Sequence, residues 1–294
     1  MNARSPLRIG FGGGGTDLFP FRSIHGGCTL SVTIKKYAYA EFDGRNNSSV
    51  LVDATKKRLN CEKKIDIDVE APPYSGLGAS AAIAVSTIGL IANGSMTKMD
   101  IADLAFKIER EDLKISGGSQ DQYCSAIGGF NYYVYDKDSV HVFPVTHTKF
   151  LDALEKNLLI VFTMKRLMSG FGGDVQKDTL ERDNDKNLLM IKETCSDMRK
   201  AMREENLENF GRILDISWQQ KKRLSPYIVN ETILRVEKES KNAGAYGFKL
   251  SGAGGGGYAV IVCNNVGAVR ERLFEIGFMP ESVKFDWDGL VVRS

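Results

Sequence analysis

The sequence is poor in the residues that cross-link small proteins or bind metals. Its five cysteines are scattered, with no Cys-x-x-Cys pair, and its three histidines form no metal-binding motif. Disulfide frameworks and zinc sites require closer and more regular spacing than this. The sequence therefore predicts reduced thiols in a fold that depends on its hydrophobic core.

Long apolar runs and a strong excess of one charge are also missing. No run of 18 apolar residues occurs, and Met1–Pro6 contains no apolar signal region. The formal net charge is only +2, which does not indicate an electrostatic nucleic-acid binder. We expect a cytoplasmic protein with neither a membrane nor a nucleic acid as its partner.

Glycine, in contrast, is abundant and clustered, with 30 glycines in 294 residues. The clusters that matter most lie at residues 10–15, 76–78, 117–118 and 252–257. Their flanking sequences differ, so they are not copies of an internal repeat. Because glycine lets a backbone approach a ligand closely, these clusters are the first places to look for a binding site.

Between the clusters, strand-like and helix-like patterns alternate irregularly. β-branched or alternating patterns predict strands at 28–42, 65–69, 130–135, 140–145, 158–163, 248–250, 258–263 and 283–287. Apolar periodicity predicts helices at 80–92, 99–111 and 266–276, and three more between 188 and 242, the last of them spanning 227–242. The pattern indicates an α+β chain rather than a doubly wound parallel sheet, with domains at 1–155 and 156–294.

The strongest local signal is the segment from Ala71 to Ala82, which reads APPYSGLGASAA. Its glycines precede a predicted helix, whose first N–H groups have no partner within the helix and can bind an anion. Ser80 adds a hydroxyl in the first turn. The alternative is a glycine turn that only packs a helix against a sheet, and this segment alone does not decide between the two.

Two further segments contain residues suited to chemistry. In residues 109–123, the carboxylates of Glu111 and Asp121 could face one cavity, one binding a metal and the other accepting a proton. The alternative makes Asp121 a helix-capping residue. Residues 249–258 contain four consecutive glycines between two predicted strands, as a close backbone approach to a ligand would require, although a tight turn is the alternative.

Taken together and in this order, the three segments resemble the motifs of the GHMP superfamily of small-molecule kinases, with residues 4–9 (RSPLRI) similar to its first motif. Within that superfamily, residues 4–17, His25-Gly-Gly27 and residues 118–123 are similar to the D-glycero-D-manno-heptose 7-phosphate kinases and, less closely, to the L-fucose kinase domains. The resemblance implies a two-domain fold, with a ribosomal-protein-like N-terminal half and a ferredoxin-like C-terminal half. The active site is expected between the halves.

The resemblance also implies roles for individual residues. Asp121 is expected to accept the proton of the sugar hydroxyl, Arg8 to assist transfer, and Ser80 with Glu111 to bind Mg²⁺, with Glu109 as the alternative metal ligand. The residues expected to bind ATP are Pro73, Ser75, Gly76, Leu77, Gly78, Ala79, Ser80 and Ala81. Those expected to bind the substrate are Gly14, Gly15, Thr16, Asp17, Gly118, Ser251, Gly252, Ala253, Gly254 and Gly255.

The implied reaction transfers phosphate from ATP to the anomeric hydroxyl of D-glycero-D-manno-heptose 7-phosphate and gives the 1,7-bisphosphate. Gly14-Gly15 replaces the Glu-His pair of galactokinases, which argues against galactose. Lys165, Arg166 and Arg22 are the basic residues expected to bind the distal phosphate of the substrate. The partner is thus a small sugar phosphate, and a homodimer fits the same scheme.

Three alternatives stay open. The same chemistry could act on L-fucose or another free sugar. The scaffold could sense sugar and ATP without turnover, although the retention of Asp121, Arg8, Ser80 and Glu111 argues against it. Residues 10–15 also match the Gly-x-Gly-x-x-Gly pattern of dinucleotide-binding oxidoreductases, but Pro20 follows and no strand-to-helix context is predicted there.

Overall fold

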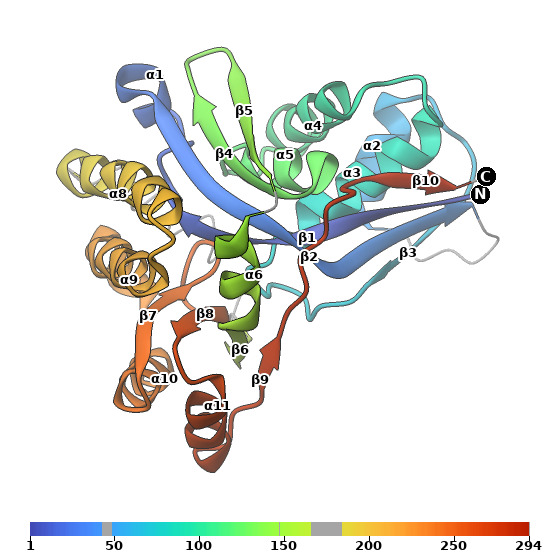
Figure 1. Ribbon diagram of the computed structural model, residues 1–294. Coiled ribbons are helices and arrows are strands. Elements are labelled where there is room, and N and C mark those ends of the chain that lie inside the picture. The colour runs from blue at the N-terminus through green and yellow to red at the C-terminus, as the bar shows by residue number, and fades with distance from the viewer. Residues whose placement is uncertain (43–48, 147, 166–183, 294) are drawn as a thin grey trace.

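The computed structural model describes residues 1–42, 49–146, 148–165 and 184–293. Two antiparallel sheets form its framework (Figure 1). The first sheet has the strand order β10-β1-β2-β4-β5, with β3 also paired to β2. Its strands are β1 (Asn2–Gly12), β2 (Gly27–Phe42), β3 (Ile65–Val69), β4 (Phe130–Tyr135), β5 (Val140–Val145) and β10 (Val291–Arg293).

The second sheet has four strands in the order β7-β8-β6-β9. These are β6 (Leu158–Met164), β7 (Ala245–Leu250), β8 (Gly257–Cys263) and β9 (Pro280–Ser282). Strand β8 lies at the centre of this sheet and every one of its residues is buried, which suits its apolar composition. The α+β class predicted from the sequence is confirmed.

Helices cover both sheets (Figure 1). In the first half of the chain they are α1 (Phe21–His25), α2 (Val50–Arg58), α3 (Ala79–Ala92), α4 (Lys98–Lys107), a π-helical turn (Ile108–Asp112), α5 (Gln120–Ile127) and α6 (Lys149–Lys156). In the second half they are α8 (Asp185–Arg203), α9 (Leu207–Leu224), a 3₁₀ turn (Pro226–Ile228), α10 (Glu231–Asn242) and α11 (Val266–Glu275). Helices α3 and α5 pack on β1 and β2, whereas α9 and α10 pack on β7.

Side-chain caps explain where several helices begin. Thr97 forms a capping box with Asp100 at the start of α4, which satisfies two otherwise unpaired donors. Asn206, Asn230 and Asn265 accept backbone N–H groups at the starts of α9, α10 and α11.

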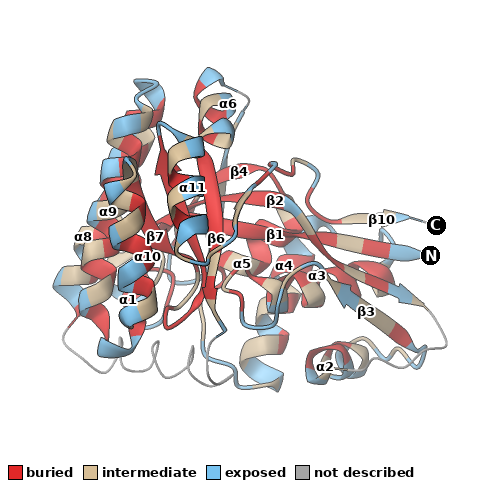
Figure 2. Cartoon of the chain, turned by 90° about the horizontal axis from the view of Figure 1, so that it is seen from below, coloured by how far each residue is buried: buried red, intermediate tan, exposed pale blue. Residues whose placement is uncertain are grey.

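One hydrophobic cluster connects the two sheets. It includes Leu7 and Phe11 of β1, Ile160 of β6 and Phe210 of α9, all fully buried. Phe11 stacks on Phe130 and meets Phe210 edge to face, with ring centroids 5.6 and 5.3 Å apart. Figure 2 shows these central strands as buried, with exposed residues on the outer sides of the helices. The two halves of the chain therefore share a core.

Apart from shifts of one to three residues at the ends of other elements, two predicted elements differ from the structure. The helix predicted over 227–242 begins only at Glu231, because residues 226–228 form the 3₁₀ turn and Val229 is extended. The strand predicted over 283–287 is only an isolated bridge between Ile34 and Phe285. The Phe285 N–H donates to the Glu155 carboxylate at 2.7 Å instead of to a neighbouring strand.

The final described strand returns to the first sheet. β10 pairs with β1, with Asn2 opposite Arg293, so residues near the two ends of the described chain lie side by side (Figure 1). Residues 156–294, predicted as the second domain, therefore contribute one strand to the sheet of the first. The division after residue 155 stays a prediction.

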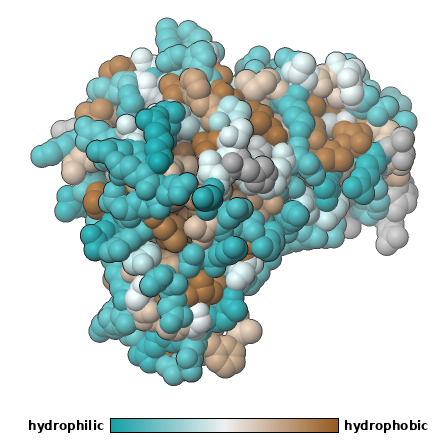
Figure 3. Space-filling model, in the orientation of Figure 1, coloured by the Kyte–Doolittle hydropathy of each residue, from teal (hydrophilic) through white to brown (hydrophobic). Residues whose placement is uncertain are grey.

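Along the described part of the chain, no helix combines the length and apolar character needed to cross a membrane. The face in Figure 3 is mostly hydrophilic, with apolar residues in small groups between hydrophilic ones. Such groups are ordinary on protein surfaces. The homodimer stays a prediction.

Candidate active site

The predicted phosphate loop lies at the N-terminus of α3 and is fixed by backbone hydrogen bonds. Gly78 adopts φ +77° and directly precedes the helix. The carbonyl of Leu77 accepts the N–H of Arg8 at 2.9 Å, and that of Ser75 accepts the N–H of Tyr258 at 2.8 Å. The loop is thus held between β1 and β8, with the first N–H groups of α3 facing out of the helix end.

Ser75 carries a hydroxyl that the fold itself does not use. The residue is 1% exposed, and its Oγ has no hydrogen-bond partner in the part of the chain that the structure describes. A buried hydroxyl without a partner is unfavourable and usually indicates a missing ligand atom or water. Together with the free N–H groups of α3, it makes this loop chemically suited to a phosphate group.

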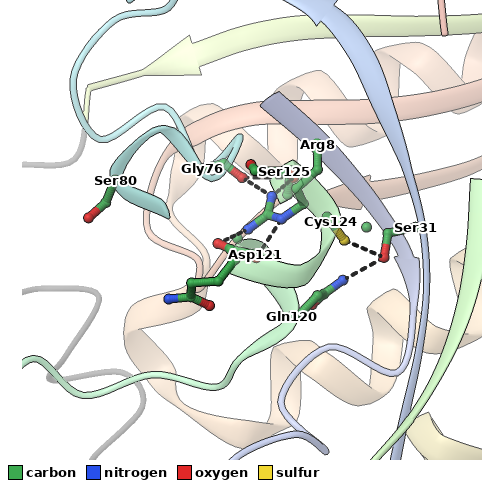
Figure 4. Close-up of polar contacts among 12 residues, drawn as sticks. Arg8, Ser31, Gly76, Ser80, Gln120, Asp121, Cys124 and Ser125 are labelled. Carbon is green, nitrogen blue, oxygen red and sulfur yellow. Dashed lines mark hydrogen bonds and ion pairs between the residues drawn. The ribbon is translucent and has the colours of Figure 1, made fainter. Parts of the chain in front are cut away.

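Arg8 and Asp121 form a bidentate ion pair beneath this loop (Figure 4). Nε and Nη2 of Arg8 donate to the two carboxylate oxygens of Asp121, each at 2.6 Å. Nη1 donates to the carbonyl of Gly76 at 2.6 Å. Burial lowers the pKa of Arg8, but the charge and hydrogen bonds of Asp121 outweigh it, and the net shift is upward.

The two partners differ in exposure. The Arg8 side chain is 6% exposed and the Asp121 side chain 32%, so the carboxylate faces the open side of the pair. Asp121 lies in the first turn of α5, two residues after the N-cap residue Ser119, and both of its carboxylate oxygens accept from Arg8. Asp121 is therefore not the N-cap residue of α5, and its role as the base stays a prediction.

The hydroxyl of Ser80 contacts the carboxylate of Glu109, and not that of Glu111, which was the first choice from sequence. Its Oγ lies 3.0 Å from Oε1 of Glu109, and Oε2 of Glu109 accepts from Gln122 at 2.5 Å. Glu111 instead pairs with Arg58 on the protein surface, at 2.9 Å. The assignment of Glu111 as the partner of Ser80 is therefore replaced by Glu109, the alternative left open by the sequence.

The π-helical turn explains this difference. In it, the N–H of Leu113 reaches the carbonyl of Ile108 at 3.1 Å, which places an extra residue in the turn after α4. Glu109 then faces Ser80, and Glu111 faces solvent. Burial raises the pKa of Glu109 to about 7, although its hydrogen bonds from Ser80 and Gln122 oppose the shift.

Asp17 is buried close by, at 4% exposure. Its Oδ2 accepts the N–H of Gln120 at 3.1 Å, and burial raises its pKa above the ordinary value. Gly118 lies directly against it, because a Cβ on Gly118 would come within 1.7 Å of Oδ2. Only glycine at position 118 allows the Asp17 carboxylate to hold this position.

The glycine turn before Asp17 combines open space with a rigid anchor. Among the described residues, a Cβ on Gly14 would meet no atom within 4 Å, whereas one on Gly15 would touch Leu188 at 3.4 Å. Thr16 is fully buried, and its Oγ1 lies 2.8 Å from the carbonyl of Gly13 and 2.9 Å from that of Cys28. Thr16 therefore fixes the turn, while Gly14 leaves room beside it.

The third glycine segment reaches the site mainly through Ser251. Its Oγ donates to the carbonyl of Gly76 at 2.9 Å and lies 3.2 Å from Nη1 of Arg8. Gly254 and Gly255 face Ile228, whose carbonyl accepts the N–H of Gly255 at 2.9 Å. Gly252 and Ala253, between them, are partly exposed.

Two lysines that the sequence did not single out support these segments. Lys221 of α9 is buried and donates to the carbonyls of Leu250 and Gly252. Lys249 donates to the carbonyl of Gly10 at 2.9 Å, and its burial, with the nearby charge of Arg8, lowers its pKa to about 8. Neither could be found from sequence, because each contact crosses from one element to another.

The dinucleotide-binding alternative does not fit the structure. Residues 10–12 belong to β1, and the turn that follows leads to α1, which begins only at Phe21. A dinucleotide fingerprint requires a helix that opens at the glycines themselves.

Comparisons with known proteins agree with this geometry. The family model "GHMP kinases N terminal domain" matches residues 47–129, and "GHMP kinases C terminal" matches residues 198–277. The chain is 29% identical to D-glycero-alpha-D-manno-heptose 7-phosphate kinase of Campylobacter jejuni, over 88% of each chain. It is 30% identical to the bifunctional fucokinase/GDP-fucose pyrophosphorylase of Arabidopsis thaliana, over 68% of this chain and 20% of that protein.

A solved structure gives the same picture. The crystal structure of a D-glycero-D-manno-heptose 1-phosphate kinase from Bacteroides thetaiotaomicron superposes with a TM-score of 0.79 at 26% identity. The alignment covers 100% of this chain and 99% of that one. The whole chain, and not only its motifs, thus follows the fold of that structure.

Proposed function

The chain belongs to the GHMP kinase family of ATP-dependent phosphotransferases, and from this premise we propose that it phosphorylates the anomeric hydroxyl of D-glycero-D-manno-heptose 7-phosphate to give the 1,7-bisphosphate. The observation that carries the proposal is the Arg8–Asp121 pair, which lies between the phosphate loop and the buried Asp17. The similarity to the Campylobacter enzyme supports the choice of sugar.

In the proposed reaction, Asp121 accepts the proton of the sugar hydroxyl as the hydroxyl oxygen attacks the terminal phosphate of ATP. Arg8 holds both oxygens of Asp121, and each oxygen keeps a lone pair for the hydroxyl. The N–H groups of α3 and the Ser75 hydroxyl bind the phosphates, and Asp17 orients the sugar. Phosphoryl transfer depends mainly on such positioning and on charge neutralisation.

Ser80 and Glu109 are the residues suited to Mg²⁺. A carboxylate and a hydroxyl 3.0 Å apart at the end of the phosphate loop supply the oxygen ligands that Mg²⁺ prefers, with phosphate oxygens and water completing the set. When bound, the ion would neutralise charge on the phosphates. The raised pKa of Glu109 fits a carboxylate that needs a cation to stay ionised.

A panel of acceptors tests the proposal directly. The protein would be incubated with Mg-ATP and, separately, with heptose 7-phosphate, free heptose, L-fucose, galactose and mannose, and both ADP and the product mass would be measured. We expect a bisphosphate from heptose 7-phosphate at the highest kcat/KM. The plant fucokinase similarity makes L-fucose the second candidate, and a preference for it would overturn our choice. Sugar and ATP binding without ADP release would indicate a sensor.

Glu109 should make stability depend on pH. Its folded-state pKa of about 7 exceeds its ordinary value of 4.5, so between these values the folded state retains a proton that the unfolded state has lost. Its contribution is therefore fully present below pH 4.5 and lost as pH rises through 7. Without ligands, Glu109→Gln should raise Tm relative to wild type at pH 8 but not at pH 4.5, as measured by thermal unfolding.

Glu111→Gln is the matched control, because Glu111 lies on the same turn but in a surface pair with Arg58. It should lack the pH-dependent gain. Equal Tm differences for Glu109→Gln at both pH values would contradict a protonated Glu109 in the free protein.

Gly14→Glu should block the acceptor site. No described residue fills the space beside Gly14. A glutamate would extend into this space and exclude the sugar, so kcat/KM for the sugar should fall by about a hundredfold. Affinity for ATP should stay unchanged. Gly14→Ala adds only a methyl group in open space and should remain active. Wild-type turnover in Gly14→Glu would show that Gly14 serves only the turn.

A further inference from the structure

The structure describes two of the three residues expected to bind the distal phosphate of the proposed substrate, and the fold uses the donors of one of them. Arg166 lies outside the described residues, and Lys165 is exposed directly after β6. Arg22 is 4% exposed and donates to the carbonyls of Asp136 and Ser139 and to the Ser119 hydroxyl. All three donor nitrogens of Arg22 are used by the fold, so it supports the β4–β5 turn.

Arg110, in contrast, is a partly buried arginine with donors to spare. Its guanidinium lies over the ring of Phe106, 5.5 Å from the ring centroid, and Nη1 donates to the carbonyl of Ile115. Within the described ranges, no carboxylate lies at ion-pair distance from it, and its Nε and Nη2 donate to nothing. Removing a cation from water without such a partner is costly.

The position of Arg110 points to the acceptor end of the site. It follows Glu109, which contacts Ser80 at the metal end. Through Ile115 it holds the loop that ends in Gly118, which touches Asp17. Burial lowers the pKa of the Arg110 guanidinium, and electrostatic attraction to the carboxylates of Glu109 and Asp17 offsets only part of that shift.

The charges of the site show why an incoming phosphate needs a further cation. Asp17, Glu109 and Asp121 are all carboxylates, and Arg8 is committed to Asp121 through both oxygens. A sugar phosphate entering beside Asp17 brings two further negative charges. It therefore needs a cation whose donors are still available, and an arginine suits a phosphate because it can donate two parallel hydrogen bonds.

We propose that Arg110 binds the phosphate group of the sugar substrate and so makes the enzyme select sugar phosphates over free sugars. This inference rests on the proposed function, because it assigns the recognition of the same acceptor. The guanidinium keeps its bond to Ile115 through Nη1, and Nε with Nη2 binds the phosphate oxygens.

Arg110→Gln tests the proposal in steady-state kinetics with heptose 7-phosphate, free heptose and ATP. We expect KM for heptose 7-phosphate to rise by about 10- to 100-fold, the loss typical of a charge-assisted hydrogen-bond pair. KM for free heptose and for ATP should each change by less than about threefold on the same scale. Arg110→Lys, which keeps the charge but not the fork, should lie between wild type and Arg110→Gln. Equilibrium binding of heptose 7-phosphate without nucleotide should show the same order.

Arg58→Gln is the matched control. Arg58 contacts the same π-helical turn from its outer side, through Glu111 and Asp112, so its loss disturbs the turn without removing a donor near Asp17. It should leave all three KM values near wild type.

The other outcomes overturn the proposal in distinguishable ways. A rise in KM for ATP alone would assign the guanidinium to the nucleotide phosphates, and equal rises for both heptoses would make it a loop-positioning residue. If none of the KM values changed, Arg110 would be only a solvated cation. If the wild type phosphorylates free sugars but no sugar phosphate, the proposed substrate fails and this inference fails with it. If the wild type phosphorylates heptose 7-phosphate and the Arg110 variants do so with an unchanged KM, the proposed function stands and this inference alone is lost.

Discussion

Asp121→Asn is expected to lower kcat by about 10²–10⁴-fold, or about 3–5 kcal/mol in activation free energy. Asparagine keeps the size of the side chain and one oxygen for Arg8, but its amide cannot accept the proton of the sugar hydroxyl. Affinity for ATP should change little, because the phosphate loop is held by Arg8 and Tyr258 through backbone bonds. Single-turnover kinetics with a binding assay for ATP separate the two quantities.

The same substitution should also lower thermal stability. Arg8 is buried, and asparagine removes the negative charge that compensates it. Breaking one partner of a buried pair costs about 3–5 kcal/mol, and the partial exposure of Asp121 places this case at the lower end. Activity must therefore be measured well below the Tm of the variant. Excess Mg²⁺ should not restore kcat, whereas rescue would make Asp121 a metal ligand, and full activity would mean that the base lies elsewhere.

Gly118→Ala is expected to abolish most acceptor binding while leaving ATP binding intact. The new Cβ would overlap the Asp17 carboxylate at 1.7 Å, so either the carboxylate or the loop must move by more than 1 Å. Displacements of this size at a reacting centre can reduce rates by about 10²-fold. We expect kcat/KM for the sugar to fall by at least about that factor, as measured in steady state with saturating ATP.

A double variant tests whether Gly118→Ala lowers kcat/KM by displacing Asp17. Asp17→Ala removes the atoms that the new methyl group would strike, so Gly118→Ala should add little to its defect, a non-additivity that independent sites do not show. Gly267→Ala, on α11 far from the site, controls for the loss of a glycine. Additive defects would place the effect of Gly118→Ala in the loop backbone instead.

The elements that sequence patterns predicted well are those whose signal is local. The range of β3 and both strands of the β4–β5 hairpin were predicted to the residue, and α3 to within one residue, because alternation and apolar content are properties of the segment itself. Short helices such as α2 carry no comparable signal, since tertiary contacts stabilise them.

The candidate site divides in the same way. The glycines of the phosphate loop were recognised from sequence, because they are clustered before a clear helix pattern. Glycine is needed there, since Gly76 and Gly78 adopt positive φ. The change from Glu111 to Glu109 depended on one π-helical turn, and a single extra residue in a turn cannot be read from periodicity. Arg8 and Asp121 lie 113 residues apart, so their contact became visible only in the fold.

The return of β10 to β1 has a consequence for biosynthesis. Asn2 is synthesised 291 residues before its partner Arg293. Until then, the outer edge of β1 presents unpaired N–H and C=O groups, the kind of edge that templates aggregation. Pairings of such sequence separation form slowly. The pairing of β10 with β1 therefore forms only after all the residues between them have been translated, and chaperones that shield strand edges would act on β1 in that interval.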